Sequence, residues 1–350
     1  MSAKTRVTGL FFLLFFFSVE QSGAQSADEV KVVPRVNFDT VFIADYTNLF
    51  TTRLFLLFEN ASILINPAND KISKIVYSPN VNVRIGIAGF WKWFGLGLSI
   101  DNPFYKTDRD AYGKTTTLDL RVNAFGRYLA GELFYQQYNG FYINSPEKAN
   151  DIHYIIPDMR TASFGLSGYW IINSKRFSIR AAFVQNEVQK KSAGSFVIRP
   201  AFLYYRISSD NGIIPAEIVS EYNIPQASLI NSGKFYSFAL SPGYIYTLVF
   251  LKHCYVTAAV FPGAAAEYSS FRNAENGYTS LDFKFQLEGR FAVGYNSGKW
   301  FLGGSFQTGF NGVPDKLNNS LFNYSVAQFR VWGGTRFDIF RKKKKSTTGV

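Results

Sequence analysis

The sequence predicts an all-β fold, a transmembrane antiparallel up-and-down β-barrel of about 12 strands, with 12–14 as the range. Three observations lead there. Apolar and polar residues alternate with a period of two along most of the chain, many alternating runs are about ten to fifteen residues long, and aromatic residues gather at their ends. Spanning strands need about 9–11 residues, whereas strands in soluble proteins average about 5–6. The long runs therefore favour a membrane barrel.

Composition supports an ordered, membrane-facing chain. Hydrophobic residues make up 47% of the chain, aromatic residues 18% and charged residues 18%, which excludes wholesale disorder. Aromatic side chains suit both strands and membrane interfaces. Pairs of them at strand ends are Trp91 with Trp93, Tyr135 with Tyr138, and Tyr295 with Trp300. These pairs are typical of the aromatic girdles of a spanning barrel.

The first 24 residues predict a cleavable signal peptide. Lys4 and Arg6 precede an eleven-residue apolar stretch, Val7 to Phe17, and small residues follow at Ser22 to Ala24. Eleven apolar residues are too few for a membrane helix, which needs about 20. We expect export, with a mature chain that begins near Gln25. Detection of Met1 by mass spectrometry in the membrane-inserted protein would contradict this.

Four segments follow from these boundaries: a signal peptide (1–24), a polar periplasmic lead-in (25–48), an outer-membrane barrel domain (49–340) and a basic tail (341–350). The tail carries Arg341 to Lys345, which can meet anionic lipid or simply remain solvated. Both alternatives stay open.

The alternating runs define the expected strands. They are Val81–Trp91, Phe94–Ile100, Thr117–Gly126, Ala162–Ile171, Phe177–Val188, Leu281–Tyr295, Trp300–Phe310 and the last strand to Ile339, with weaker candidates near 52–65 and 213–221. The apolar segment Gly243–Pro262 would place Lys252 at the centre of a membrane helix, at a cost of about 2.5–3.5 kcal/mol. We therefore expect a hairpin that turns at Lys252–His253.

Connection lengths alternate between short and long. Tight turns are expected near 91–93, 127–128, 173–175, 251–253 and 296–299, and long loops at 101–115, 139–160, 221–233, 267–280 and 311–325. Strict alternation closes only if both weak strands are counted, which gives fourteen. The number therefore stays between twelve and fourteen.

One parity of the alternating strands is polar and charged, which assigns it to the lumen. The lumen-lining residues predicted in this way are Arg84, Asp119, Arg121, Arg180, Lys284, Glu288, Arg290, Arg330, Arg336 and Asp338. They either pair across strands and fill a narrow barrel, or line a conduit whose basic excess favours anions. Acids and bases alternate even within one strand, so paired filling is the favoured interpretation.

Catalytic and metal-binding signals are weak. The two histidines, His153 and His253, have no recognisable catalytic partner spacing, and the one cysteine, Cys254, lies on an apolar strand parity. No zinc spacing, calcium loop or phosphate-binding loop occurs. We expect no cofactor, no metal and no enzymatic activity. Nucleic acid is an improbable partner for an exported chain, despite its net charge of +12.

Several sequence blocks resemble a known family. The blocks "DTVFIADYTNLFTTRLFL", "YSPNVNVRIGIAGFWKWFGLGLSI", "TTTLDLRVNAFGRYLAGELFYQQYNGFYI" and "QKKSAGSFVI" are similar to an uncharacterised family of Bacteroidota outer-membrane barrels, domain of unknown function 4421. The resemblance runs from about Asp39 to Phe340. It implies a fold and an outer-membrane location, and it brings no activity and no catalytic residues.

Three classes of function remain open. The favoured one is a structural, assembly or partner-binding barrel with a charge-filled lumen, in contact with outer-membrane lipid and with a protein partner bound through its long loops. The alternative is a passive channel or small-solute transporter, which would conduct in planar bilayers. A barrel lipid hydrolase is the least favoured and would depend on His153 or His253.

Overall fold

The computed structural model describes residues 37–65, 75–81, 83–104, 107–144, 153–223, 230–272, 277–311 and 322–339. The predicted signal peptide (1–24) and basic tail (341–350) lie outside the described residues. So does the first half of the predicted lead-in.

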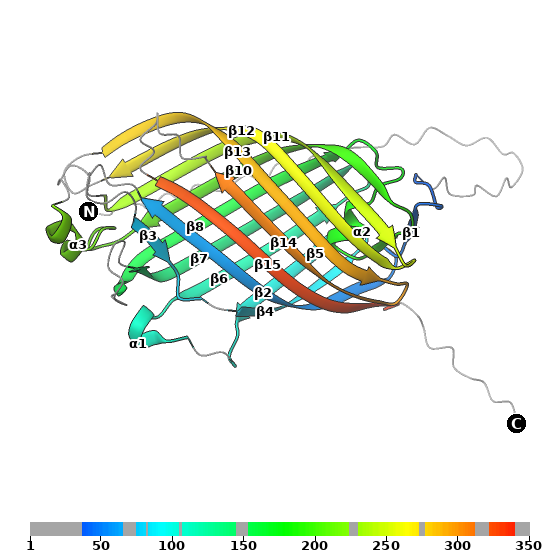
Figure 1. The fold of residues 1–350 in the computed structure, drawn as a ribbon, viewed down its shortest axis with the longest axis horizontal. Coiled ribbons are helices and arrows are strands. Elements are labelled where there is room, and N and C mark those ends of the chain that lie inside the picture. The colour runs from blue at the N-terminus through cyan, green and yellow to red at the C-terminus, as the bar shows by residue number, and fades with distance from the viewer. Residues whose placement is uncertain are drawn as a thin grey trace, which may run out of the picture. The chain divides into compact units, whose positions relative to one another are not determined.

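Within these residues, twelve antiparallel strands form one closed sheet (Figure 1). They are β2 (Phe50–Ile65), β4 (Val83–Trp91), β5 (Phe94–Asp101), β6 (Thr116–Phe125), β7 (Leu129–Asn144), β8 (His153–Ile171), β10 (Ala193–Ser208), β11 (Ser232–Phe250), β12 (Cys254–Arg272), β13 (Gly277–Asn296), β14 (Trp300–Asn311) and β15 (Phe322–Phe337). The last strand pairs with the first, from Phe337 opposite Phe50 to Phe322 opposite Ile65. The predicted barrel is confirmed, with twelve strands.

The two ends of the barrel differ. One end carries the turns at 92–93, 126–128, 251–253 and 297–299 together with α2 (Ile179–Phe183) and β1 (Ile43–Asp45), and we call it the plug end. The other carries α1 (Arg109–Tyr112), α3 (Ala216–Tyr222) and β3 (Ile75–Ser78), and we call it the loop end. The predicted hairpin at Lys252–His253 is confirmed, because Phe250 pairs with Cys254. The long loop predicted at 267–280 is wrong, because β12 and β13 pair as far as Arg272 and Gly277.

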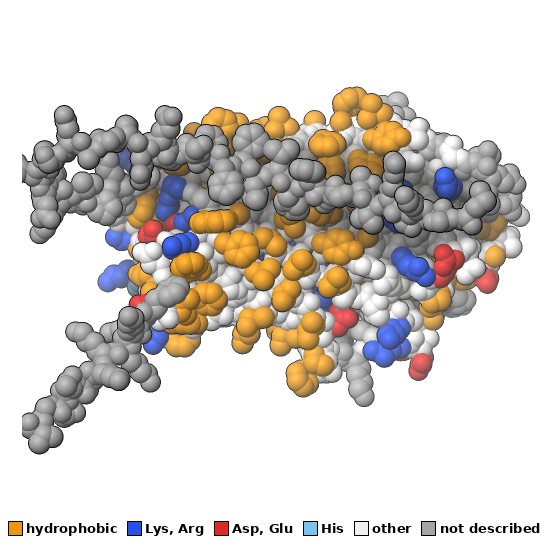
Figure 2. All heavy atoms as spheres, turned by 180° about the vertical axis from the view of Figure 1, so that it is seen from behind, with side chains coloured by type: hydrophobic (Ala, Val, Ile, Leu, Met, Phe, Trp, Pro, Cys, Tyr) orange, Lys and Arg blue, Asp and Glu red, His pale blue; other side chains and the backbone are white. Residues whose placement is uncertain are grey.

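The wall alternates between an exposed apolar face and a buried inner face. On β2, Leu54 and Leu56 are exposed while Arg53 and Phe55 are buried. On β13, Phe283 is 76% exposed. Figure 2 shows hydrophobic side chains over the middle of the wall, with charged side chains toward the two ends. Such an extensive exposed apolar surface matches a lipid-facing belt.

The segment between β8 and β10 folds inside the lumen. It contains α2 and β9 (Glu187–Gln189), and β9 pairs with β1 in a separate two-stranded sheet. We call β1, α2 and β9 the plug. Its apolar residues share a core with inward side chains of the wall, among them Phe55, Tyr169 and Trp332. The barrel strand predicted at Phe177–Val188 is therefore wrong. The tight turn predicted at 173–175 does form, with the amide of Phe177 bonded to the Asn173 carbonyl (3.0 Å), but it leads into the plug instead of a barrel strand.

A second apolar core lies toward the loop end. Ile213, Ile214 and Ile218 pack there with Tyr205 of β10 and Phe235 of β11. The weak strand predicted at 213–221 is wrong, because this segment forms α3, which follows Pro215 and ends at a left-handed Asn223. No helix in the described ranges is long and apolar enough to cross a bilayer.

Candidate functional site: a charged lumen closed by a plug

Wall side chains hold the plug by hydrogen bonds to its backbone. Arg53 of β2 donates to the Phe183 carbonyl (2.8 Å) and to Gln185 Oε1 (3.1 Å). Arg336 of β15 donates through Nε to the Gln185 carbonyl (2.6 Å). Asn296 of β13 donates to the carbonyls of Ala181 (3.2 Å) and Glu187 (2.9 Å). The unpaired carbonyls of this short buried segment thus find donors on the wall.

Glu187 is the electrostatic centre of the plug. Its carboxylate pairs with Arg180 of α2 (3.0 Å) and with Arg127, which lies in the turn between β6 and β7. It also accepts a hydrogen bond from Ser178, which caps α2 by accepting from the amide of Ala181 (3.0 Å). The Glu187 side chain is fully buried, and a buried carboxylate is tolerated only with such partners.

A second network crosses the lumen on the loop-end side of the plug. Arg290 of β13 donates two hydrogen bonds to Glu132 of β7, at 3.0 and 2.8 Å, and one to Glu288 at 2.7 Å. Arg199 of β10 pairs with the other oxygen of Glu288 (2.7 Å). Tyr169 of β8 donates to Glu132 (2.7 Å). Two arginines and two glutamates thus compensate each other inside the barrel.

A third network lies between β2, β4, β6 and β7. Glu59 and Asp119 both pair with Arg84, at 3.1 and 3.3 Å, and both pair with Arg121, at 3.5 and 3.1 Å. Gln136 of β7 donates to Glu59 (3.0 Å). The Arg84 side chain is completely buried, so its two carboxylates compensate the loss of its hydration. This cluster is also balanced, with two cations and two anions.

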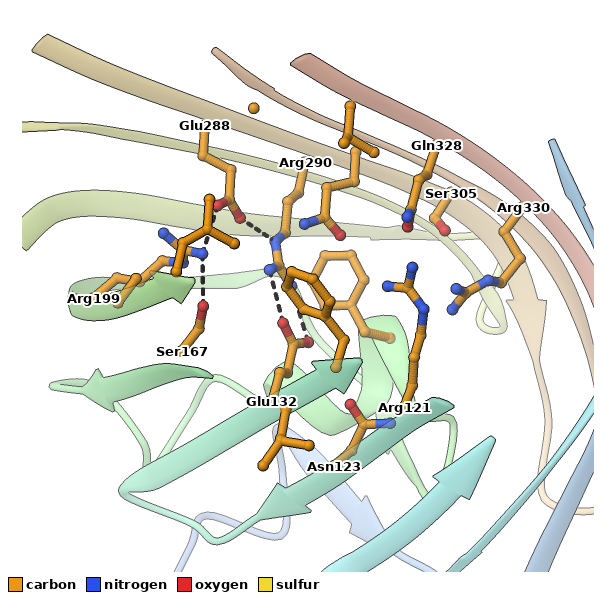
Figure 3. A pocket seen from close by; sticks show the side chains of 18 of the residues that line it. Arg121, Asn123, Glu132, Ser167, Arg199, Glu288, Arg290, Ser305, Gln328 and Arg330 are labelled. Carbon is orange, nitrogen blue, oxygen red and sulfur yellow. Dashed lines mark hydrogen bonds and ion pairs between the residues drawn. The ribbon is translucent and has the colours of Figure 1, made fainter. Parts of the chain in front are cut away.

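A cavity of about 210 Å³ lies between these networks (Figure 3). The plug residues Phe183 and Val184 line it together with side chains of β2, β6, β7, β8, β10, β11, β13, β14 and β15. Its charged lining residues are Arg53, Arg121, Arg199, Arg290, Arg330, Glu132 and Glu288. Five cations and two anions therefore face one cavity.

The structure places the residues predicted to line the lumen in several different surroundings. Arg84, Asp119 and Arg121 meet in the third network, and Glu288 and Arg290 in the second. Lys284 pairs with Glu267 (2.6 Å), and Arg336 binds the plug. Arg330 lines the cavity. The remaining two lie off the barrel strands: Arg180 is on α2 within the plug, and Asp338 follows the end of β15 with an exposed side chain.

Several important lumen residues are absent from the sequence prediction. These are Arg53, Glu59, Glu132, Glu187 and Arg199. Four of them lie on barrel strands and face inward, but their inward neighbours include the apolar Phe55, Leu57 and Val197, so alternation of polarity does not mark them clearly. Glu187 lies in the plug, where alternation has no meaning.

Of the two histidines and the cysteine, the structure describes the side chains of His253 and Cys254. His253 lies in the exposed turn between β11 and β12, with its ring 5.6 Å from that of Tyr295. Cys254 begins β12 and is partly buried, and the side chain of His153 is outside the described residues. Among the residues that the structure describes, no group of three His, Cys, Asp or Glu side chains could hold a metal ion.

Comparison with solved structures returns outer-membrane barrels. Outer membrane protease OmpT from Escherichia coli is 10% identical over 84% of this chain and 98% of its own, with a TM-score of 0.35. The translocator domain of autotransporter NalP from Neisseria meningitidis is 13% identical over 84% and 90%, with a TM-score of 0.37. Ail, the attachment invasion locus protein of Yersinia pestis, is 8% identical over 83% and 98%, with a TM-score of 0.24.

Curated proteins give no match to this chain. A family model does match, over residues 37–337, which include the plug and all twelve strands of the barrel. The chain therefore belongs to the family described as domain of unknown function DUF4421.

Proposed function

We propose that this protein is an outer-membrane barrel whose lumen is closed by the plug. Its role is structural or partner-binding, and it is neither an open passive pore nor an enzyme. The single observation that carries the proposal is the plug. Eleven of the twelve barrel strands contribute inward residues to the apolar core that surrounds α2, so little room is left for a water-filled path at this end.

The charged networks support the same conclusion. In a conducting pore, the charged side chains of the lumen are hydrated and can interact with passing ions. Here Arg290 and Glu132 join opposite sides of the wall directly, and both side chains are largely buried. Paired groups of this kind brace the wall and leave few free charges for ion conduction.

The two outer surfaces indicate what the barrel contacts. The exposed apolar belt fits the hydrocarbon region of a membrane, and outer-membrane lipid is the partner that it requires. The loop end presents α1 and α3, structured elements that suit recognition by another protein. Neither surface suggests binding to nucleic acid.

Single-channel recording of the refolded protein in planar bilayers tests the proposal. We expect no sustained open-channel current. The matched variant replaces residues 174–192 with a short Gly-Ser linker. The linker can close the gap, because the backbone amide of Asn173 already donates to Ser195 Oγ (2.8 Å). This variant should conduct, since it lacks α2 and β9. A large steady current through the unaltered protein would contradict the proposal.

The second candidate function is a small-solute channel, and the cationic excess of the lumenal cavity is the observation that favours it. Conduction by this route requires the plug to move. A channel would therefore show current bursts that disappear when the plug is tethered to the wall, for example by a bifunctional thiol cross-linker between cysteines that replace Phe183 and Arg53, since Arg53 reaches the Phe183 carbonyl with the end of its long side chain.

A further inference from the structure

The cavity on the loop-end side of the plug is lined by more arginines than carboxylates. Arg199 and Arg290 are matched by Glu288 and Glu132. Arg121 belongs to the balanced cluster with Arg84, Glu59 and Asp119. Two lining arginines, Arg53 and Arg330, remain. Among the described residues, no carboxylate lies within ion-pair distance of either one.

The guanidinium of Arg53 contacts only neutral groups among the described residues. It donates to the Phe183 carbonyl and to Gln185, and it lies 5.0 Å from the ring of Phe90 and 5.6 Å from that of Trp332. These contacts orient the side chain but leave its charge in place, because amides and rings carry no net charge. Arg53 therefore adds positive potential to the cavity.

Arg330 has fewer contacts. Its guanidinium lies 4.9 Å from the ring of Phe55, and its Nε is buried without a hydrogen-bond acceptor in the described structure. Figure 3 shows the guanidinium groups of Arg330 and Arg121 turned toward one another at one side of the cavity. Two cations can face each other inside a protein only where an anion or bound water lies between them.

Neutral donors surround the same side of the cavity. Ser305 lies beside Arg330, and Asn123 lies beside Arg121 (Figure 3). Gln328 also lies beside Arg330, where its amide donates to Glu59 (2.6 Å). Guanidinium forks together with amide and hydroxyl donors are the groups that recognise carboxylates and phosphates. The cavity volume of about 210 Å³ far exceeds the ~10–15 Å³ that a single water needs, so a small polyatomic anion fits.

We propose that the lumenal cavity is a binding site for a small free oxyanion, a phosphate or a carboxylate, held by Arg330 and Arg121 with Arg53 adding to the positive potential. This inference rests on the closed lumen proposed above, because a closed lumen retains a ligand that an open pore would only pass. The bound anion supplies an acceptor at ion-pair distance from Arg330, whereas Asp119 and Glu59 act on this arginine only from farther away.

The probes are inorganic phosphate and succinate, titrated into the folded protein in detergent micelles at constant ionic strength, with glucose as a neutral control. Calorimetry gives the affinity and thermal unfolding gives the midpoint Tm. We expect either anion, but not glucose, to bind and to raise Tm. Constant ionic strength is essential because added salt alone screens the repulsion between the arginines.

The test variant is Arg330→Gln, with Lys284→Gln as the matched control. Lys284 is also a lumenal cation on a barrel strand, but it is paired with Glu267 and does not line the cavity. Arg330→Gln should weaken anion binding roughly tenfold to a hundredfold, the range for one charge-assisted hydrogen-bonding group. In the absence of anion it should fold at least as well as the unaltered protein, because it removes an uncompensated charge. Lys284→Gln should bind as the unaltered protein does.

Three outcomes would overturn the proposal: no binding of either anion, equal stabilisation of the unaltered protein and Arg330→Gln, or equal weakening by both variants. If Arg330→Gln does not fold, Arg330→Lys replaces it. Lysine keeps the charge and loses the planar fork, so the affinity should still fall. Conductance separates this result from the proposed function. An open pore would show current whether or not anions bind, and a closed barrel without an anion site would show neither.

Discussion

Arg290 on β13 and Glu132 on β7 are joined by two hydrogen bonds across the inside of the barrel, although 158 positions separate them in the sequence. Four strands lie between β7 and β13 on one side of the sheet, and six lie between them on the other. The pair therefore spans the lumen close to its full width and fixes the distance between two nearly opposite walls.

Replacing Arg290 with Gln should destabilise the barrel by about 3–5 kcal/mol, because Glu132 would be left as a buried charge without its cation. Denaturant unfolding in micelles measures the difference. Arg160→Gln is the control, since its pair with Asp210 is 61% and 76% exposed and should contribute at most about 1 kcal/mol. The double variant Arg290→Gln, Glu132→Gln should recover part of the loss. Unchanged stability combined with altered anion conductance would instead indicate a hydrated pore.

The two faces of β13 should respond differently to charge. Phe285 is exposed on the outer wall and Gln286 is buried in the lumen. Phe285→Arg should cost about 2–4 kcal/mol if the position lies near the bilayer midplane, whereas Gln286→Arg should cost much less. The comparison is made by unfolding in lipid bilayers. Equal costs would show that the outer face is not in contact with lipid.

Gly86 on β4 should not accept a side chain. A Cβ atom at this position would lie 2.1 Å from Cζ of Phe55 and 2.7 Å from the carbonyl oxygen of Leu98. Gly86→Ala should therefore destabilise the protein by about 1–3 kcal/mol through overpacking. It should also weaken anion binding, because Phe55 contacts Arg330. Gly333→Ala is the control, since a Cβ there meets nothing within 4 Å.

The turn between β11 and β12 should be stabilised by glycine. Leu251 and Lys252 have φ angles of 48° and 66°, a left-handed conformation that costs a side-chain-bearing residue roughly 1–2 kcal/mol. Lys252→Gly should raise the free energy of unfolding by about 0.5–1 kcal/mol, after the greater flexibility of glycine in the unfolded chain is subtracted. Lys299→Gly, in a turn residue without a positive φ, should lower it. A loss in both variants would contradict this explanation.

The wall of the barrel was predictable because lipid and lumen impose opposite polarity on alternate residues. That constraint gave the parity of Glu288, Arg290 and Arg330 directly. It does not act on α2 and β9 of the plug, whose side chains are buried on both parities. Arg180 and Glu187 lie on opposite parities of the segment predicted as a strand, and one of them would have faced lipid. This conflict was visible in the sequence and argues against a lipid-facing strand.

The pairing of charged residues across the lumen was not predictable in the same way. Alternation shows that Glu132 and Arg290 both point inward, but not that their strands stand opposite each other. That relation depends on the number of strands, which stayed open between twelve and fourteen while two weak segments were unresolved. One of these became β2 and the other became α3.

The inserted part of the plug, α2 and β9, has both of its chain connections at one end of the barrel, since β8 ends and β10 begins there and Asn173 bonds to Ser195 across the gap. No part of this insert has to be threaded past the strands or through the loop end. The barrel wall and the inserted segment can therefore fold in either order without forming a knot. An insert that enters the lumen from one mouth can also leave by it, so any release of α2 and β9 would carry them out on the side on which the first barrel strand begins and the last one ends.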